Sequence, residues 1–143
     1  IIQQCVESQN YILEEFYKNL KINYELFNFT DNIFEYFSRV ELVITRSGSS
    51  VTAELINCKI PFISIPYPHS ADSHQDKNAA YFEKEGYSFL IKENEVHKKL
   101  FPLIKLIYSD KKILNNLIKA QKKHSDEDVF IKINNEIKRL TNE

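Results

Sequence analysis

The chain has 143 residues, of which 43% are hydrophobic and 13% aromatic, a composition typical of a folded domain rather than a disordered segment. Its 19 basic and 20 acidic residues are mixed along the sequence, so no basic surface for nucleic acid is expected. Two cysteines are too few for a disulfide framework, and no apolar run reaches the ~18 residues of a membrane span.

Apolar periodicity predicts alternating strands and helices. In chain order we expect a strand at 1–4, an amphipathic helix at 7–20, a strand at 22–29, a short helix at 31–37, a strand at 42–45, a helix at 51–58, a strand at 61–66, a helix at 74–85, a strand at 88–91 and helices over 93–141. Asp31 is expected to cap the short helix, with Ile33, Phe34 and Phe37 facing inward, and Gly86 to end the helix at 74–85. Breaks in the last helical region are expected near residues 109–110 and 125–126.

Strands connected through single helices are typical of an α/β fold with a parallel sheet. Ligands of such sheets bind beyond the carboxyl ends of the strands. The loops at that edge are residues 29–31, 46–50 and 67–74. The three candidate motifs are therefore expected on one rim of the sheet.

The sequence RSGSSVTAE, residues 46–54, joins a predicted buried strand to a predicted helix. Free N–H groups at such a helix start, together with the helix dipole, suit phosphate or sugar oxygens. Glu54 would lie one turn inside the helix, where a carboxylate can accept two neighbouring ribose hydroxyls. Serine and glycine at a helix start more often serve only as caps, and the G-x-S-x-G pattern of a hydrolase is not met.

The loop at 66–75, PYPHSADSHQ, contains His69 and His74 with Asp72 between them. This spacing leaves open a metal site or a Ser-His-Asp hydrolase, but the loop has no second carboxylate and nothing marks one serine as activated. A polar, hydrogen-bonding loop at the ligand edge is favoured over both. Gln75 and Asn78 share a helix face, where their amides either bind sugar hydroxyls or face solvent.

Residues 29–33, FTDNI, follow the second predicted strand. Such a segment can hold a flat base against apolar side chains while backbone groups read its edge. A plain turn from strand to helix explains the same residues and is the simpler interpretation of them.

Taken together, residues 46–91 resemble the C-terminal domain of the MurG family of peptidoglycan N-acetylglucosaminyltransferases. The family pattern is roughly R-[AS]-G-A-x-T-x-x-E, then a P-x-x-x-x-P strand and a P-H-x-x-D-x-H-Q-x-x-N-A helix start. The IIQQC opening and the FTDNI turn also match in order and spacing, whereas the last 50 or so residues fit only as generic helices. The resemblance implies a GT-B glycosyltransferase, with two Rossmann-like domains and the donor bound in the C-terminal one.

The matched positions imply donor-binding roles for Thr30, Ile33, Arg46, Gly48, Ser49, Ser50, Val51, Glu54, His74, Gln75 and Asn78. By this resemblance the backbone of Thr30 reads uracil, Ile33 packs beside the base, and Glu54 takes the ribose hydroxyls. The N–H groups of residues 48–50 face the sugar and phosphates. Val51 stands where the family usually has threonine, with Thr52 one place later.

At the sugar end, the resemblance implies that His74, Gln75 and Asn78 contact the GlcNAc hydroxyls and that Arg46 organises the 46–50 loop. The N-terminal acceptor domain and the Gly-rich loop of the first strand are expected upstream of Ile1, together with the catalytic residues. The chain, which contains no methionine, is accordingly interpreted as a partial C-terminal domain over residues 1–143 that is inactive alone.

The activity implied is inverting transfer of GlcNAc from UDP-GlcNAc to lipid I, giving lipid II, without a metal or other cofactor. The lipid acceptor implies a peripheral enzyme at the cytoplasmic face of the bacterial inner membrane, with UDP-GlcNAc, lipid I and the membrane surface as partners. Two alternatives remain: a GT-B enzyme for another UDP-sugar, and a non-catalytic sugar-nucleotide-binding subunit completed by a partner chain.

Overall fold

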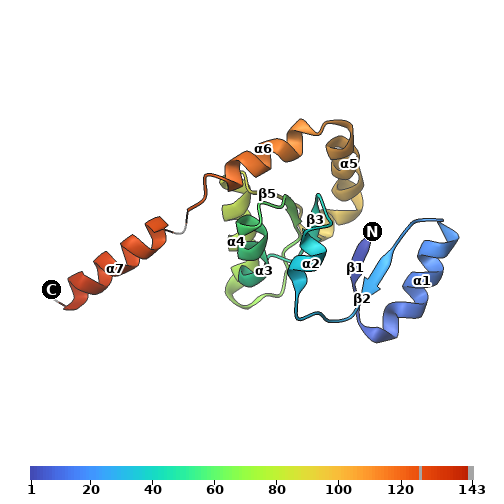
Figure 1. The fold of residues 1–143 in the computed structure, drawn as a ribbon, viewed down its shortest axis with the longest axis horizontal. Coiled ribbons are helices and arrows are strands. Elements are labelled where there is room, and N and C mark those ends of the chain that lie inside the picture. Colours follow the sequence, from blue (N-terminus) through green and yellow to red (C-terminus); the bar gives the residue numbers. More distant parts are fainter. Residues whose placement is uncertain (126, 142–143) are drawn as a thin grey trace. The chain divides into compact units, whose positions relative to one another are not determined.

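A computed structural model describes residues 1–125 and 127–141 of the chain (Figure 1). The chain forms two compact units, residues 1–40 and 41–143, which are described one at a time. The predicted α/β class is confirmed, because the described strands pair in parallel and are separated by helices. The pairing of the strands is described below within each unit.

The first unit contains β1 (Ile2–Gln4), η1 (Glu7–Gln9), α1 (Asn10–Asn19), β2 (Glu25–Phe27) and α2 (Ile33–Phe37). β1 and β2 pair in parallel, with Ile2 opposite Glu25. The predicted helix at 7–20 is thus a 3₁₀ turn followed by α1. Tyr17 is the buried side chain of α1; its ring stacks on Tyr24 and its hydroxyl donates to Gln3 of β1.

Two predictions for the short helix α2 are wrong. Its N-cap is Asn32, and the N–H of Asn32 donates to the hydroxyl of Thr30 at 3.0 Å, so the Thr30 side chain closes the turn that Asp31 was expected to cap. Phe34, expected to face inward, is 54% exposed, whereas Phe37 is buried. A five-residue helix completes little more than one turn and buries only one narrow face.

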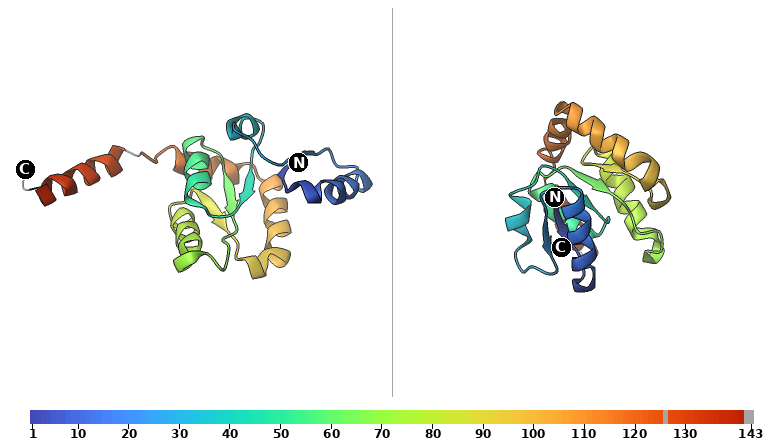
Figure 2. Two further views of the ribbon diagram at one scale, coloured as in Figure 1. Left: turned by 90° about the horizontal axis from the view of Figure 1, so that it is seen from below. Right: turned by 90° about the vertical axis from the view of Figure 1, so that its right-hand side faces the viewer.

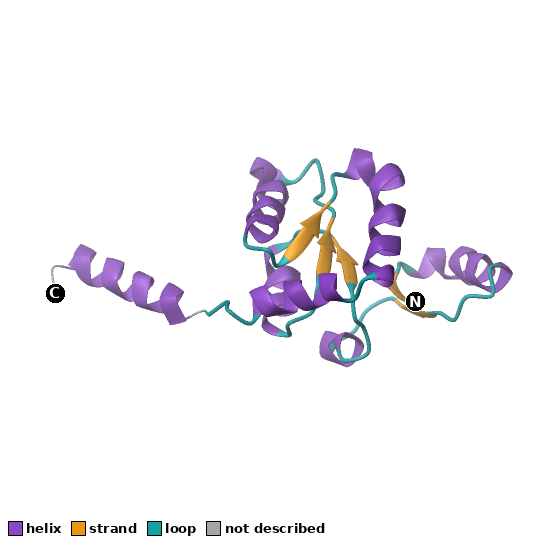
Figure 3. Ribbon diagram, turned by 90° about the horizontal axis from the view of Figure 1, so that it is seen from above, coloured by secondary structure: helices purple, strands orange, loops and turns teal. Residues whose placement is uncertain are grey.

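The second unit is built on three parallel strands, β3 (Val43–Thr45), β4 (Phe62–Ser64) and β5 (Ser88–Leu90), in the order β3-β4-β5. α3 (Ser49–Asn57) joins β3 to β4, and α4 (His74–Lys84) with the 3₁₀ turn η2 (Ala71–Ser73) joins β4 to β5. Figure 3 shows the three arrows pointing the same way. The loops that follow these strands therefore lie at one edge of this sheet.

Helices cover both faces of this sheet. Figure 2 shows α5 (Val96–Ser109) on one side of the strands and α3 and α4 on the other. Every residue of the central strand β4 is buried; Phe62 contacts Phe82 of α4, and Ile63 belongs to a core cluster with Ile107 of α5. The chain continues from β5 through η3 (Glu93–Glu95), α5, α6 (Lys112–Gln121) and α7 (Glu127–Thr141).

The predicted breaks in the C-terminal helical region are confirmed where the structure describes them. α5 ends at Ser109, and α6 ends at Gln121 before α7 begins at Glu127; of the predicted break at 125–126, residue 126 lies outside the described residues. Over residues 1–125 and 127–141, no helix combines the length and apolar character needed to cross a bilayer.

Left-handed residues end two helices of this unit in the same way. Gly86, predicted to end the helix at 74–85, has φ of 73° and follows α4. The N–H of Tyr87 reaches back to the carbonyl of Phe82, which closes a Schellman motif. α3 ends likewise, with the N–H of Ile60 bonded to Leu55, but there Lys59 occupies the left-handed position at φ 60°.

The amide of Gln121 anchors α6 to the opposite edge of the sheet, where β4 and β5 begin. Its side chain is fully buried, and Nε2 donates to the carbonyls of Ile60 at 3.0 Å and Tyr87 at 2.9 Å. Both carbonyls belong to the loops that bring the chain back from α3 and α4. One side chain from a distant helix thus completes the hydrogen bonding of two strand entries.

Candidate functional site

The carboxyl edge of the β3-β4-β5 sheet carries most of the predicted site residues. Arg46 and the Ser47–Gly48 turn follow β3, the loop at 65–73 follows β4, and η3 follows β5. Parallel strands place the ends of all three loops side by side. The sheet therefore brings together residues that lie up to 47 positions apart in the sequence.

The start of α3 is open toward this edge. Gly48 is the N-cap and has no side chain to cap the helix, and the first N–H to find a carbonyl within the helix is that of Thr52, bonded to Gly48. The N–H groups of Ser49, Ser50 and Val51 therefore have no acceptor within the helix. α3 begins two residues earlier than predicted, so all three lie in its first turn.

Thr52 cannot replace the hydroxyl that Val51 lacks. Its side chain is fully buried, and Oγ1 donates to the carbonyls of Gly48 at 2.7 Å and Ser49 at 3.1 Å. These bonds stiffen the helix start from inside. Glu54 is half-buried one turn further on, and within the described part of the chain its carboxylate forms no hydrogen bond or ion pair.

Asn78 ties α4 to the turn before α3. Its Nδ2 donates to the carbonyl of Ser47 at 3.1 Å. A carbonyl can only accept, so this bond fixes the orientation of the amide and leaves Oδ1 available as an acceptor. The hydroxyl of Ser47 itself is buried with no hydrogen-bond partner among the described residues.

A backbone group also fixes the side-chain amide of Gln75, but here the amide oxygen is the bonded atom. The N–H of Tyr67 donates to Oε1 of Gln75 at 2.9 Å, so the amide nitrogen of Gln75 remains free to donate. Nδ1 of His74 lies 2.7 Å from the carbonyl of Ala71 and must be the protonated nitrogen, which leaves Nε2 as the outer atom. The start of α4 thus presents polar atoms whose donor or acceptor character is set by backbone partners.

Two non-glycine residues in the left-handed conformation precede α4. Asp72 has φ of 49° and Ser73 has φ of 53°, in a region that side chains with a Cβ rarely adopt. Such backbone is kept where surrounding contacts over-determine it. Here the contacts of Gln75 and His74 with the loop before α4 hold the turn in place.

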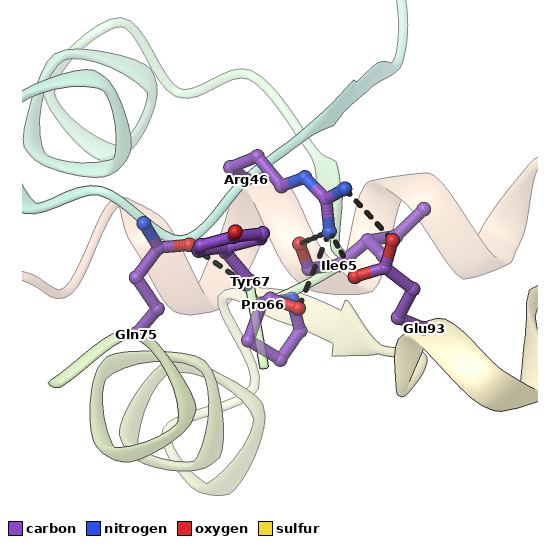
Figure 4. A network of polar contacts seen from close by, with 6 residues as sticks. All are labelled: Arg46, Ile65, Pro66, Tyr67, Gln75 and Glu93. Carbon is purple, nitrogen blue, oxygen red and sulfur yellow. Dashed lines mark hydrogen bonds and ion pairs between the residues drawn. The ribbon is translucent and has the colours of Figure 1, made fainter. Parts of the chain in front are cut away.

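The guanidinium of Arg46 links the three loops of this edge (Figure 4). It forms a bidentate ion pair with Glu93, with nitrogen–oxygen distances of 2.9 and 3.1 Å. Its Nη1 also donates to the carbonyls of Ile65 and Pro66. Its carbon lies 5.6 Å from the centre of the Tyr67 ring. The mutual hydrogen bonds lower the pKa of Glu93 and raise that of Arg46, so both are charged at neutral pH.

The Arg46–Glu93 pair also borders a cavity of about 390 Å³ at the same edge of the sheet. Its lining residues are Ile44, Thr45, Arg46, Ile65, Glu93, Val96 and His97. Arg46 is the predicted site residue among them; the helix starts of α3 and α4 lie outside this cavity.

Thr30 and Ile33 belong to the first unit and are described within it. Thr30 is half-buried and its hydroxyl accepts from Asn32, while Ile33 begins α2 and is half-buried. Their predicted contacts with a base remain predictions. The expectation that residues 29–31 share a rim with the loops of the second unit also stays a prediction.

The metal alternative for the histidine loop finds no support in the described residues. No group of three or more histidine, cysteine, aspartate or glutamate side chains in them is placed to hold an ion. His69 instead contacts the Tyr67 ring edge-on. In the loop at 66–75, His74 contacts the carbonyl of Ala71 and the hydroxyl of Ser70 accepts from the N–H of Gln75, so neither contact pairs a serine with a histidine as the hydrolase alternative requires.

Sequence reasoning missed Glu93 and the role of Tyr67. Glu93 begins the 3₁₀ turn η3 shortly after β5, so the rule that ligand sites lie at carboxyl ends was a signal that pointed to it. Tyr67 acts through its backbone N–H, for which the sequence carries no signal.

Comparison with known proteins identifies the family of this chain. Residues 1–132 match the pattern of the Glycosyltransferase family 28 C-terminal domain. A protein of Rickettsia bellii is 38% identical over 120 residues, which are 83% of this chain and 34% of that protein. One of Prochlorococcus marinus is 37% identical over 130 residues, 87% of this chain and 36% of that protein. Both are named UDP-N-acetylglucosamine--N-acetylmuramyl-(pentapeptide) pyrophosphoryl-undecaprenol N-acetylglucosamine transferase.

The crystal structure of Acinetobacter baumannii MurG is similar in fold, with a TM-score of 0.74 at 17% identity, over 87% of this chain and 37% of that one. The chain spans about a third of the length of the curated relatives that it matches. The resemblance to the MurG family is confirmed by these matches. The chain belongs to the family of glycosyltransferase family 28 C-terminal domains.

Proposed function

We propose that this chain supplies the UDP-GlcNAc-binding part of an enzyme that transfers GlcNAc to lipid I and so forms lipid II in peptidoglycan synthesis. The names of the two relatives above support the donor and the acceptor, and each relative matches more than four-fifths of this chain. The proposed reaction is the transfer of a hexosyl group with inversion. The acceptor site and the catalytic residues for this reaction are proposed to lie in other parts of the enzyme.

The observation that carries the proposal is the open start of α3 with Glu54 one turn inside it. The free N–H groups of Ser49, Ser50 and Val51 suit the phosphates of a sugar nucleotide. Glu54 lies on the same helix with no protein partner among the described residues, as a carboxylate that takes both ribose hydroxyls would. Phosphate and ribose are adjacent in UDP, and so are these groups on α3.

The sugar would meet the start of α4. The free amide nitrogen of Gln75 donates, whereas Oδ1 of Asn78 and Nε2 of His74 accept. Each sugar hydroxyl both donates and accepts, so a set with both characters can read their positions. Because the bonds to backbone fix which atom faces outward, these side chains need no reorientation when a sugar binds.

In the transfer, the C4 hydroxyl of the acceptor sugar gives its proton to a base in another part of the enzyme and attacks C1 of GlcNAc, and the bond from C1 to the phosphate oxygen of UDP breaks. Negative charge then develops on the leaving diphosphate. N–H groups and a helix dipole that already point toward it stabilise that charge more than they stabilise the substrate. Arg46 is engaged by Glu93 and is therefore proposed to organise the edge and not to contact phosphate directly.

The acceptor carries a polyprenyl chain, so we propose that the enzyme works as a peripheral protein on the cytoplasmic face of the inner membrane. Thr30 and Ile33 are proposed to hold the uracil, as the resemblance implies. No part of the proposal requires a resident metal or cofactor.

The test is a binding titration of the purified protein with UDP-GlcNAc and with UDP, comparing wild type with Glu54→Gln. The amide keeps the shape of Glu54 but loses charge-assisted acceptance, so both ligands should bind about tenfold more weakly. Glu85→Gln, on an exposed residue at the far end of α4, is the matched control and should bind both ligands as wild type does. Unchanged affinity in Glu54→Gln would remove the ribose role.

A donor screen decides between this proposal and other UDP-sugars on the same fold. UDP-GlcNAc should bind more tightly than UDP-glucose and UDP-GalNAc. A screen in which another sugar nucleotide binds best would make this a transferase of that sugar. Failure of every sugar nucleotide to bind would overturn the donor-binding role altogether.

A further inference from the structure

We propose that Glu93 is a positioning residue for recognition of the sugar part of the donor, acting through Arg46 on Gln75. The inference rests on the donor-binding function proposed above. Glu93 lies after β5, and among the described residues its hydrogen bonds reach only one predicted donor-binding residue, Arg46. Its influence on the sugar must therefore pass through a series of contacts, each of which the structure shows.

The first step joins Glu93 to the loop after β4. Both carboxylate oxygens accept from Arg46, which holds the plane of the guanidinium in one orientation. In that orientation Nη1 also reaches the carbonyls of Ile65 at 3.4 Å and Pro66 at 3.3 Å. Figure 4 shows the carboxylate on one side of the guanidinium and the two carbonyls beside the same nitrogen.

The second step joins that loop to Gln75. Tyr67 follows Pro66 directly, its ring lies 5.6 Å from the guanidinium carbon, and its N–H donates to Oε1 of Gln75. A shift of residues 65–67 therefore moves the group that fixes the amide of Gln75. Without the Tyr67 N–H, that amide is free to rotate, and its nitrogen no longer points in one direction.

The nucleotide end is held separately. The start of α3 is fixed by the hydroxyl of Thr52 on the carbonyls of Gly48 and Ser49, and the Ser47 carbonyl is held by Asn78. None of these contacts uses Glu93. Loss of the Glu93 carboxylate should consequently weaken binding of the sugar and leave binding of the ribose and phosphates unchanged.

The pair is exposed enough to be changed without unfolding the protein. The side chains of Arg46 and Glu93 are 47% and 43% exposed, and ion pairs of that kind contribute little to overall stability. Glu95 offers a matched control, because it lies in the same 3₁₀ turn and pairs with Lys99, a residue of α5. Glu93→Gln and Glu95→Gln remove the same charge two residues apart.

The experiment measures the dissociation constants of UDP-GlcNAc and of UDP for wild type, Glu93→Gln and Glu95→Gln. We expect Glu93→Gln to weaken UDP-GlcNAc binding about fivefold, the equivalent of one hydrogen bond, with less than about a twofold change for UDP. Glu95→Gln should change neither. Arg46→Lys, which keeps the charge but not the bidentate geometry, should reproduce the loss, and combining it with Glu93→Gln should add little.

Equal weakening of UDP and UDP-GlcNAc in Glu93→Gln, or no change in either, would overturn the inference while leaving donor binding intact. Absence of binding to wild type would instead overturn the proposed function. A second readout needs no ligand: the side-chain amide NMR signals of Gln75 should shift in Glu93→Gln and stay in place in Glu95→Gln. Signals of Gln75 that do not move would also refute the series of contacts.

Discussion

Replacing Gln121 with leucine should destabilise the second unit without touching the site. The substitution roughly keeps the volume of the side chain but removes the amide nitrogen that donates to the carbonyls of Ile60 and Tyr87. The Gln121 side chain that faces these carbonyls is fully buried. Each buried carbonyl left without a partner costs about 1–3 kcal/mol. Oε1 of Gln121 has no partner in the described structure, and its removal offsets part of that cost. The expected loss in the free energy of unfolding is about 2–3 kcal/mol.

The measurement is thermal unfolding followed by circular dichroism, where a loss of that size lowers Tm by roughly 8–15 °C for a unit of this length. Gln121→Glu supplies a diagnostic partner variant. Burial beside two carbonyl oxygens should raise the pKa of the introduced carboxyl group. The stability of the Gln121→Glu protein should therefore be retained at pH values below the pKa of an ordinary glutamate and lost as pH rises through the raised pKa. A leucine variant as stable as wild type, or a glutamate variant indifferent to pH, would refute the hydrogen-bond account of how α6 is anchored.

Two further changes test the backbone and the charges. Lys59→Gly should stabilise the protein by about 0.5–1 kcal/mol, because Lys59 holds φ at 60° where glycine carries no steric cost; a lower denaturation midpoint in urea would contradict this. The pKa of Glu93 is lowered by its hydrogen bonds with Arg46, so its contribution to stability is present above about pH 4, the range of an unfolded glutamate, and is lost as pH falls through the lowered value. The difference in Tm between wild type and Glu93→Gln should accordingly be constant near neutral pH and shrink below about pH 4. If the difference in Tm stayed the same down to pH 3, the ion pair would not be its cause.

The fold class could be predicted because each local pattern pointed to the same answer. The largely apolar segment at 61–66 predicts a strand, and the helix pattern after it predicts a crossover to a parallel neighbour. Strand lengths were overestimated: residues 22–29 were predicted as a strand, but β2 contains only Glu25–Phe27. Pairing with a neighbour decides how many residues count as strand, and a sequence window does not contain the neighbour.

The side-chain environment was predicted less well than the elements. The apolar spacing of Ile12, Leu13, Phe16 and Leu20 predicts an amphipathic helix. Leu13 is half-buried, but the other three are more than half exposed, and Tyr17 is buried instead. Burial depends on what lies opposite a helix face, and the two-stranded sheet of the first unit is narrow. Periodicity predicts which residues share a face but not whether that face is covered.

For the candidate site, the sequence by itself determined which residue types stand at the ends of the strands: Ser-Gly-Ser-Ser before a helix, Glu54 one turn in, and two amides on the face of α4. Those are local properties, because strand, turn and helix start are written in consecutive residues. Only the tertiary structure decided that Glu93 meets Arg46 across three strands, and that backbone groups of Tyr67 and Ser47 orient Gln75 and Asn78. Hydrogen bonds between distant segments depend on how the sheet stacks its loops, and that arrangement exists only once the strands have paired.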